Sequence, residues 1–313
     1  MAGLSIAVLL AEKRHAAPLG HPENAARLNS IATQLESLMA TGKAHPLNCR
    51  EHGIESITHI HDESYIANLR EICKRGAGYL DADTYVSSGS FEAALAMADA
   101  ALSGVDEVFG GRNRRVFVLG RPPGHHAERD HAMGFCLINN VAVAAQYAID
   151  HYGAKRVAIV DFDVHHGNGT QHAFYDRQDV FFVSSHRYPF YPGTGGADET
   201  GVRDGKGYTI NLPLSAGSGD EALLNGFESS VIPALERYRP DMVLVSAGFD
   251  AAVGDPLGGM TVTGEGFLHI GKLIRKLADR TCGGRIVSVL EGGYDNRGNR
   301  ESIMSYLDGI GFD

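Results

Sequence analysis

The sequence is poor in cysteine, and the few thiols that it has lie far apart. Four cysteines are spread over 313 residues without a CxxC pair, at Cys49, Cys73, Cys136 and Cys282. A disulfide framework and a thiolate zinc cage both need cysteines at shorter, paired spacings. The pattern therefore argues against both kinds of protein and predicts reduced, mostly buried thiols.

Basic charge is also scarce. The chain has 28 lysines and arginines against 38 aspartates and glutamates, which gives a formal net charge of -10. A surface without a positive excess has no electrostatic means of holding a polyanion, so we expect no direct binding of nucleic acid. The negative charge modestly favours cationic substrates such as lysine-rich tails or polyamines.

Long apolar runs are absent as well. The first residues, MAGLSIAVLL, are apolar, but no basic stretch precedes them and AEKRH follows, which fits a short strand better than a signal peptide. No run approaches the roughly 18 apolar residues that a membrane helix needs. We therefore expect a soluble, cytoplasmic protein without a membrane partner, whose oligomeric state the sequence leaves open.

Short runs rich in β-branched residues alternate with helical patterns along the whole chain. Strands are expected at residues 4–10, 116–119, 157–160, 180–183, 208–212, 242–245 and 286–290. Helices are expected at residues 22–39, 91–109, 138–152, 221–238 and 264–278. The alternation predicts an α/β fold with a single open, mainly parallel sheet, helices on both faces and a ligand site at the carboxyl ends of the strands. Because no repeat or linker divides the chain, residues 1–313 are expected to form one domain.

Residues that bind metals gather where the strand at 157–160 ends. The next segment reads DFDVHHGNG, and Asp161, Asp163 and His165 share one face if the backbone stays extended. Carboxylates and imidazoles suit zinc, whose catalytic sites use about three protein ligands and keep one position for water. Asp250, after the strand at 242–245, is the candidate ligand from a second strand end. A lone aspartate at such a position is more often a helix cap or a loop hydrogen-bond acceptor.

Two adjacent imidazoles, His125 and His126, follow the strand at 116–119. They are either a solvated loop pair or catalytic groups, because burying both in a core would require partners for four ring nitrogens. Near a metal they would act as acid and base, with Asp161 and Asn168 as acceptors that orient their second nitrogens. Tyr294 follows two glycines after the strand at 286–290, and its phenol would stabilise an oxyanion, although a structural role is equally consistent with this position.

Seven motifs occur in the order PPGHHA, GFCLINN, DFDVHHGNGT, PGTGG, SAGFDA, GDPLGG and EGGYD. Together they closely resemble the arginase/deacetylase superfamily, most of all the class II histone deacetylases and the bacterial histone-deacetylase-like amidohydrolases and acetylpolyamine amidohydrolases. The resemblance is dense from about residue 81 to residue 295, and His21, Pro22, Glu23 and Arg27 extend it toward the start. It implies a zinc-dependent hydrolase that converts N-acetyl-lysine to the free amine and acetate.

The resemblance also implies a role for each motif residue. It implies one zinc ion per chain, bound by Asp163, His165 and Asp250. His125 and His126 would form a tandem pair in which His126 is the general base and acid, and Tyr294 would polarise the carbonyl. Asp161 would accept from His125 and Asn168 from His126, and asparagine in place of the class I aspartate indicates class II. A potassium site would use Asp161, Asp163, His165, Ser184 and Ser185, and the acyl-lysine tunnel would use Gly134, Phe135, Tyr191 and Leu257.

Four further positions bear on the expected substrate, on activity and on product release. Polyamine-selective relatives carry a glutamate at the position of Leu257, so the apolar residue favours an acetylated lysine peptide or protein. An acetylated polyamine or another small-molecule amide stays the alternative substrate. Tyr294 implies a competent enzyme, because some class II members have histidine there and lose most activity toward acetyl-lysine. Arg27 matches an arginine beside the acetate-exit channel. Asp83 is either a substrate-holding residue of the rim or a solvated loop acid.

Two rival functions are less well supported by the residues. A two-metal hydrolase of the arginase type needs a second carboxylate two residues after Asp250, where this chain has Ala252. A non-catalytic reader of acetyl-lysine would have no use for His125, His126 and Tyr294 together.

Overall fold

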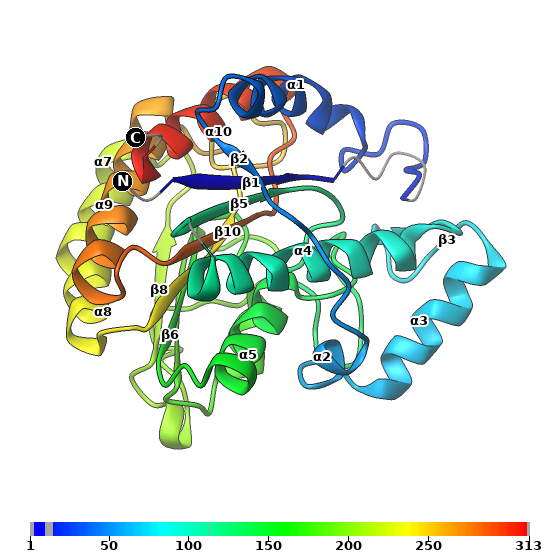
Figure 1. The fold of residues 1–313 in the computed structure, drawn as a ribbon, viewed down its shortest axis with the longest axis horizontal. Coiled ribbons are helices and arrows are strands. Elements are labelled where there is room, and N and C mark those ends of the chain that lie inside the picture. The colour runs from blue at the N-terminus through cyan, green and yellow to red at the C-terminus, as the bar shows by residue number, and fades with distance from the viewer. Residues whose placement is uncertain (1–2, 10–14, 112, 312–313) are drawn as a thin grey trace.

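The protein is described by a computed structural model that covers residues 3–9, 15–111 and 113–311. Eight parallel strands form one sheet in the order β2-β1-β5-β10-β9-β6-β7-β8 (Figure 1). They are β1 (Leu4–Val8), β2 (His45–Pro46), β5 (Arg115–Leu119), β6 (Val157–Asp161), β7 (Val180–Arg187), β8 (Thr209–Leu214), β9 (Met242–Ala247) and β10 (Ile286–Leu290). The short strands β3 (Gly78–Tyr79) and β4 (Tyr85–Val86) form a separate antiparallel pair. The parallel sheet confirms the predicted fold class.

Helices cover both faces of the sheet. Figure 1 shows α4 and α5 on one side and α1 and α10 on the other. The helices are α1 (Ala26–Ala40), α2 (Glu55–Thr58), α3 (Glu63–Arg75), α4 (Ser90–Gly110), α5 (Asn140–Tyr152), α6 (Asn168–Phe174), α7 (Asp220–Gly226), α8 (Ile232–Tyr238), α9 (Gly264–Thr281) and α10 (Asn296–Ile310). A π-helical turn, Phe227–Val231, joins α7 to α8, and a short 3-10 turn spans Arg203–Gly205. In the described part of the chain, none of the helices has both the length and the apolar character that a membrane crossing requires.

The apolar strands are explained by burial of both faces. In β5, Phe117 and Leu119 belong to the hydrophobic cluster on one side of the sheet, whereas Val116 and Val118 belong to the cluster on the other side. All four side chains are fully buried. Side chains of a strand alternate between faces, so a central parallel strand covered by helices on both sides must be apolar at every position. The short β-branched runs of the sequence are these central strands.

The predicted boundaries differ from the observed ones mainly at element ends. Leu10, predicted as the last residue of the first strand, lies outside the described residues, and β7 continues four residues beyond its predicted end. The helix predicted from residue 22 begins at Ala26, because the side chain of Asn24 accepts a hydrogen bond from the Ala26 amide and the preceding residues bend. Helices α2, α3, α6 and α10 and the two-residue strands β2, β3 and β4 were not predicted, and the helix predicted over residues 221–238 is divided by the π-helical turn.

Candidate active site

The candidate site lies at one edge of the sheet, where neighbouring strands end. Strands β5, β10, β9, β6 and β7 are consecutive in the sheet, and their carboxyl ends lead into residues 121–126, 291–294, 248–257, 162–168 and 188–191. Since parallel strands end at the same edge, these five segments meet although they are far apart in the sequence. All the motifs predicted to carry chemistry are therefore brought together.

The three predicted zinc ligands form a compact group. The ligand atoms of Asp163, His165 and Asp250 all lie within 4.8 Å of one another. His165 Nδ1 is 3.1 Å from Asp163 Oδ1 and 3.2 Å from Asp250 Oδ2. Tetrahedral zinc with bonds of about 2.0–2.1 Å separates its ligand atoms by roughly 3.3 Å, so the spacing suits this ion. Asp250 Oδ2 is buried, and apart from the His165 ring nitrogen it has no hydrogen-bonding partner among the described residues, as expected of an oxygen that faces a cation.

The charges of this group also call for a cation. Burial and the charge of Asp163 raise the pKa of Asp250 to about 7. Burial lowers the pKa of His165, but the hydrogen bonds and charges of Asp163 and Asp250 outweigh it and raise this pKa to about 10. Without a metal, a proton on the imidazole balances the two carboxylates. A divalent ion would supply that positive charge and displace the proton.

The ligands converge through a bend rather than along a strand face. Strand β6 ends at Asp161, so the extended backbone that the sequence argument assumed for residues 161–165 does not persist. The amide of Asp163 donates to Asp161 Oδ1 (3.0 Å) and the amide of Val164 to Asp250 Oδ1 (2.8 Å). These bonds turn Asp163 and His165 toward Asp250. Asp161 instead turns toward the tandem histidines.

His125 and His126 are buried side by side, with ring centroids 4.0 Å apart, rather than solvated. His125 Nδ1 is 2.9 Å from Asp161 Oδ2, and His126 Nδ1 is 2.7 Å from Asn168 Oδ1, as predicted. Burial lowers the pKa of His125, but the charges of Asp161 and Asp163 raise it to about 10. Burial and the charge of His125 hold the pKa of His126 well below its usual range. His125 is therefore a cation that can stabilise negative charge, and His126 is a neutral imidazole that can act as a base.

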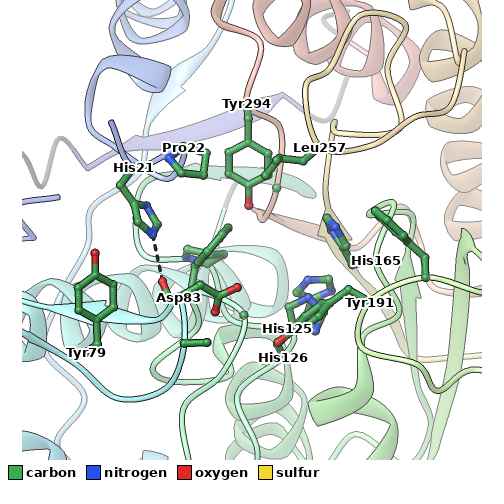
Figure 2. Close-up of a pocket in the computed structure, with 16 residues that line it drawn as sticks. His21, Pro22, Tyr79, Asp83, His125, His126, His165, Tyr191, Leu257 and Tyr294 are labelled. Carbon is green, nitrogen blue, oxygen red and sulfur yellow. Dashed lines mark hydrogen bonds between the residues drawn. The ribbon is translucent and has the colours of Figure 1, made fainter. Parts of the chain in front are cut away.

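Tyr294 is held by its surroundings with its hydroxyl toward the cavity. Figure 2 shows this hydroxyl pointing to the side on which His125 and His126 lie. The Arg27 guanidinium stands 4.7 Å from the centre of the tyrosine ring and donates to the carbonyls of Glu291 (2.6 Å) and Gly293 (2.8 Å). Burial raises the pKa of Tyr294 well above its usual value, so the phenol stays a hydrogen-bond donor. Arg27 thus lies beside Tyr294, and the acetate-exit channel that the resemblance places next to this arginine stays a prediction.

A cavity of about 430 Å³ connects these groups to the surface. The four predicted tunnel residues all line it: Gly134, Phe135, Tyr191 and Leu257. Gly134 has a φ of +54°, and a Cβ there would lie 2.4 Å from Cδ2 of His126, so only glycine lets the wall approach the ring. At the mouth, Asp83 lines the cavity and its carbonyl lies 3.0 Å from His21 Nε2 (Figure 2). Asp83 therefore lies among the residues that line the cavity, and its role as a substrate-holding residue stays a prediction.

The residues predicted to bind potassium surround the end of β6. Asp161 is paired in register with Ser184 of β7, and Ser185 Oγ lies 3.5 Å from the Asp161 carbonyl oxygen. Asp163 and His165 follow directly in the chain, so the five residues are neighbours.

Several buried charged residues around the site were not predicted. Glu291 Oε2 accepts from the amides of Gly124 (2.6 Å) and His125 (3.1 Å), which fixes the backbone of the tandem histidines. Deeper in the fold, Glu23 and Arg121 form a fully buried ion pair with bonds of 2.5 and 2.6 Å. A charged residue one or two positions after an apolar strand, as at Glu291 and Arg121, was the signal that could have found two of them.

Comparison with known proteins decides the family. Residues 21–310 match the family model described as the histone deacetylase domain. The chain belongs to the histone deacetylase family. It is 42% identical over 302 residues to histone deacetylase 10, chloroplastic, of Oryza sativa subsp. japonica, an alignment that covers 91% of this chain and 67% of the relative.

A bacterial relative and a solved structure agree with that assignment. The histone deacetylase-like amidohydrolase of Pseudomonas aeruginosa is 37% identical over 279 residues, covering 89% of this chain and 73% of the relative. The crystal structure of the HDA15 HD domain superimposes with a TM-score of 0.92 at 38% identity, covering 99% of this chain and 88% of that one. This histone deacetylase family member is therefore a hydrolase of the deacetylase type, as its motifs implied.

Proposed function

We propose that this family member is a zinc-dependent deacetylase that hydrolyses the amide of N-acetyl-lysine to the free amine and acetate. The observation that carries the proposal is the convergence of a three-residue metal group, a tandem histidine pair and a phenol on one cavity with apolar walls. Family membership supports the reaction class. The metal, the substrate and the roles of the residues belong to the proposal.

One zinc ion per chain would be held by Asp163, His165 and Asp250, whose spacing and charge fit it. Bound zinc would supply Lewis-acid activation of the amide carbonyl and of the attacking water. A potassium ion is proposed beside it, near the end of β6, at Asp161, Asp163, His165, Ser184 and Ser185.

The chain's own residues would move the protons. His126 starts neutral and donates from Nδ1 to Asn168 Oδ1, so its Nε2 takes the proton of the attacking water. His125, kept cationic by Asp161, stabilises the negative charge of the tetrahedral intermediate. The Tyr294 hydroxyl donates to the developing oxyanion. His126 finally returns its proton to the nitrogen of the leaving amine, which completes the hydrolysis.

The cavity walls favour a lysine side chain as the leaving group. Phe135, Tyr191 and Leu257 give an apolar lining that suits an uncharged alkyl chain, and Leu257 offers no charge to a second ammonium group. We therefore propose an acetylated lysine peptide or protein as the substrate. The acidic rim residue Asp83 makes an acetylated polyamine the alternative.

The test compares turnover of an acetyl-lysine peptide and of N-acetylputrescine by the zinc-loaded protein. We expect kcat/KM to favour the peptide by about tenfold or more, which corresponds to roughly 1.4 kcal/mol. Leu257→Glu should shift the preference toward N-acetylputrescine, and Leu257→Gln is the control of the same shape without the charge. A wild-type preference for the polyamine would overturn the substrate assignment.

Two further outcomes would point to the rival functions. Intact zinc binding without acetate release from either substrate would indicate a reader of acetyl-lysine, and two manganese ions per chain would indicate a hydrolase of the arginase type. The cytoplasmic location expected from the sequence stays a proposal, which cell fractionation with an antibody to the native chain would test.

A further inference from the structure

A carboxylate stands behind Asn168, on the side away from the catalytic ring. Glu128 follows the tandem histidines by two residues, and its side chain is only 12% exposed. Its Oε1 accepts a hydrogen bond from Asn168 Nδ2 at 2.5 Å. The backbone of Glu128 is fixed on both sides, because its amide donates to the His131 carbonyl (3.0 Å) and its carbonyl lies 2.7 Å from His61 Nδ1.

The amide of Asn168 can be turned two ways, and the two have opposite effects on His126. With Oδ1 toward the ring, His126 Nδ1 must carry the proton, which leaves Nε2 free as a base. With Nδ2 toward the ring, Nδ1 becomes the acceptor and the proton moves to Nε2, where it blocks proton abstraction. The two orientations have nearly the same shape, so packing alone does not choose between them.

The hydrogen-bond partners of Asn168 Nδ2 choose the productive orientation. An ionised carboxylate only accepts hydrogen bonds, so Glu128 can face the NH₂ end of the amide but not its oxygen. The other contacts of Nδ2, the His126 carbonyl at 3.4 Å and Met133 Sδ at 3.2 Å, are also acceptors but are weaker by distance or by atom type. The charge-assisted bond to Glu128 is therefore the main constraint.

We propose that Glu128 is a positioning residue that fixes the amide of Asn168 and, through it, the tautomer of His126. This inference rests on the proposed role of His126 as the general base. Glu128 touches no reacting atom; its carboxylate supplies the charge that an asparagine lacks at the position next to the catalytic ring. Glu128 also contacts a residue at the surface. Its Oε1 lies 2.8 Å from Nδ1 of the half-exposed His172, and this hydrogen bond raises the pKa of that imidazole.

The test replaces the carboxylate of Glu128 by an amide and then the amide of Asn168 by a carboxylate. In Glu128→Gln, the new amide can present its NH₂ end to Asn168 and stabilise the flipped orientation. We expect kcat on the acetyl-lysine peptide to fall about fivefold with an unchanged KM, because one hydrogen bond of about 1 kcal/mol is lost from the productive state. Adding Asn168→Asp should restore kcat to within about twofold of the parent. A carboxylate accepts from His126 through either oxygen, so it needs no fixed amide, and the glutamine introduced at position 128 can donate to it.

Controls separate this role from a structural one. Glu199→Gln changes a carboxylate of a nearby loop, which accepts from Gln171 and from the amides of Gly195 and Gly196 but does not contact the tandem histidines. It should leave kcat unchanged. The zinc content of Glu128→Gln should equal that of the parent, and its melting temperature should fall by no more than about 2 °C, the contribution of the exposed contact with His172. A structural defect would lower both further.

Two results would overturn the inference. One is a Glu128→Gln enzyme with the kcat of the parent, and the other is a further fall in kcat when Asn168→Asp is added to it. Both require a parent enzyme that releases acetate. Failure of the zinc-loaded parent itself to turn over acetyl-lysine peptide would instead refute the proposed function.

Discussion

Replacing Tyr294 by phenylalanine removes one hydroxyl from the proposed oxyanion site and little else. The ring is held by the Arg27 guanidinium 4.7 Å from its centre, and its backbone amide donates to Asp255 Oδ2 at 2.6 Å. Neither contact uses the hydroxyl, so phenylalanine should occupy the same place. The metal group and the tandem histidines should also be unaffected.

The expected loss follows from the hydroxyl's role as a donor to the oxyanion. Removing one such donor costs about 2.7–4 kcal/mol, so kcat should fall by about 100- to 1000-fold. Because burial keeps the pKa of Tyr294 well above its usual range, the phenol stays protonated and the ratio of parent to variant rates should be the same at neutral and mildly alkaline pH.

The assay is acetate release from an acetyl-lysine peptide at saturating substrate, with zinc content measured on the same samples. Tyr188→Phe is the control, because Tyr188 is an exposed tyrosine of the loop after β7 and should keep the parent rate. A Tyr294→Phe enzyme with full zinc and a kcat within tenfold of the parent would refute the assignment of the phenol.

Three other predictions test the metal, the cavity wall and a charged cluster far from the site. Chelation should lower the melting temperature and zinc at about 100 times its Kd should raise it by roughly 5 °C, since such binding contributes about 2.7 kcal/mol; a calorimetric scan that does not respond to zinc would contradict the assigned ligands. Gly134→Ala should lower kcat by about 100-fold or more because its Cβ would displace His126, whereas Gly153→Ala, also at positive φ but with open space around it, should keep the parent kcat. Burial lowers the pKa of His52, but hydrogen bonds and charges of Asp106 and Asp99 outweigh it and raise this pKa to about 9. Protonated His52 therefore stabilises the folded protein fully below about pH 6.5, and this contribution is lost as the pH rises through 9. Urea denaturation should accordingly show that His52→Gln costs about 1 kcal/mol at pH 6, after allowance for solvent screening, and almost nothing at pH 10; equal losses at both pH values would count against the ion pair.

The parts of the site that were predicted from the sequence are local in the chain. Each apolar strand ends next to the residues that carry its chemistry, as Asp163 and His165 do after β6. A parallel sheet brings such ends together whatever the order of its strands, so the contact between Asp250 and His165 followed without knowledge of the topology.

The parts that were missed depend on contacts between distant residues. Glu23 and Arg121 are 98 positions apart, and Glu128 and Asn168 are 40 apart, so no periodicity or spacing in one sequence links them. The start of α6 at Asn168 was missed because DFDVHHGNGT is rich in glycine and polar residues, whereas the helix is stabilised by tertiary contacts of Thr170 with Asn139 and of Gln171 with Asn211. The bend after Asp161 was missed for the same reason.

Helix α1 supports the active centre although it lies far from the strand ends in the sequence. Arg27, at the start of α1, clamps the carbonyls on either side of Gly292, and that glycine packs against Asp163 and Asp250. A shortened chain that begins after α1 would keep Asp163, His165, Asp250 and the tandem histidines. It would lose the contacts that hold residues 291–294 and orient the phenol of Tyr294. Variants for crystallisation or display should therefore retain this helix.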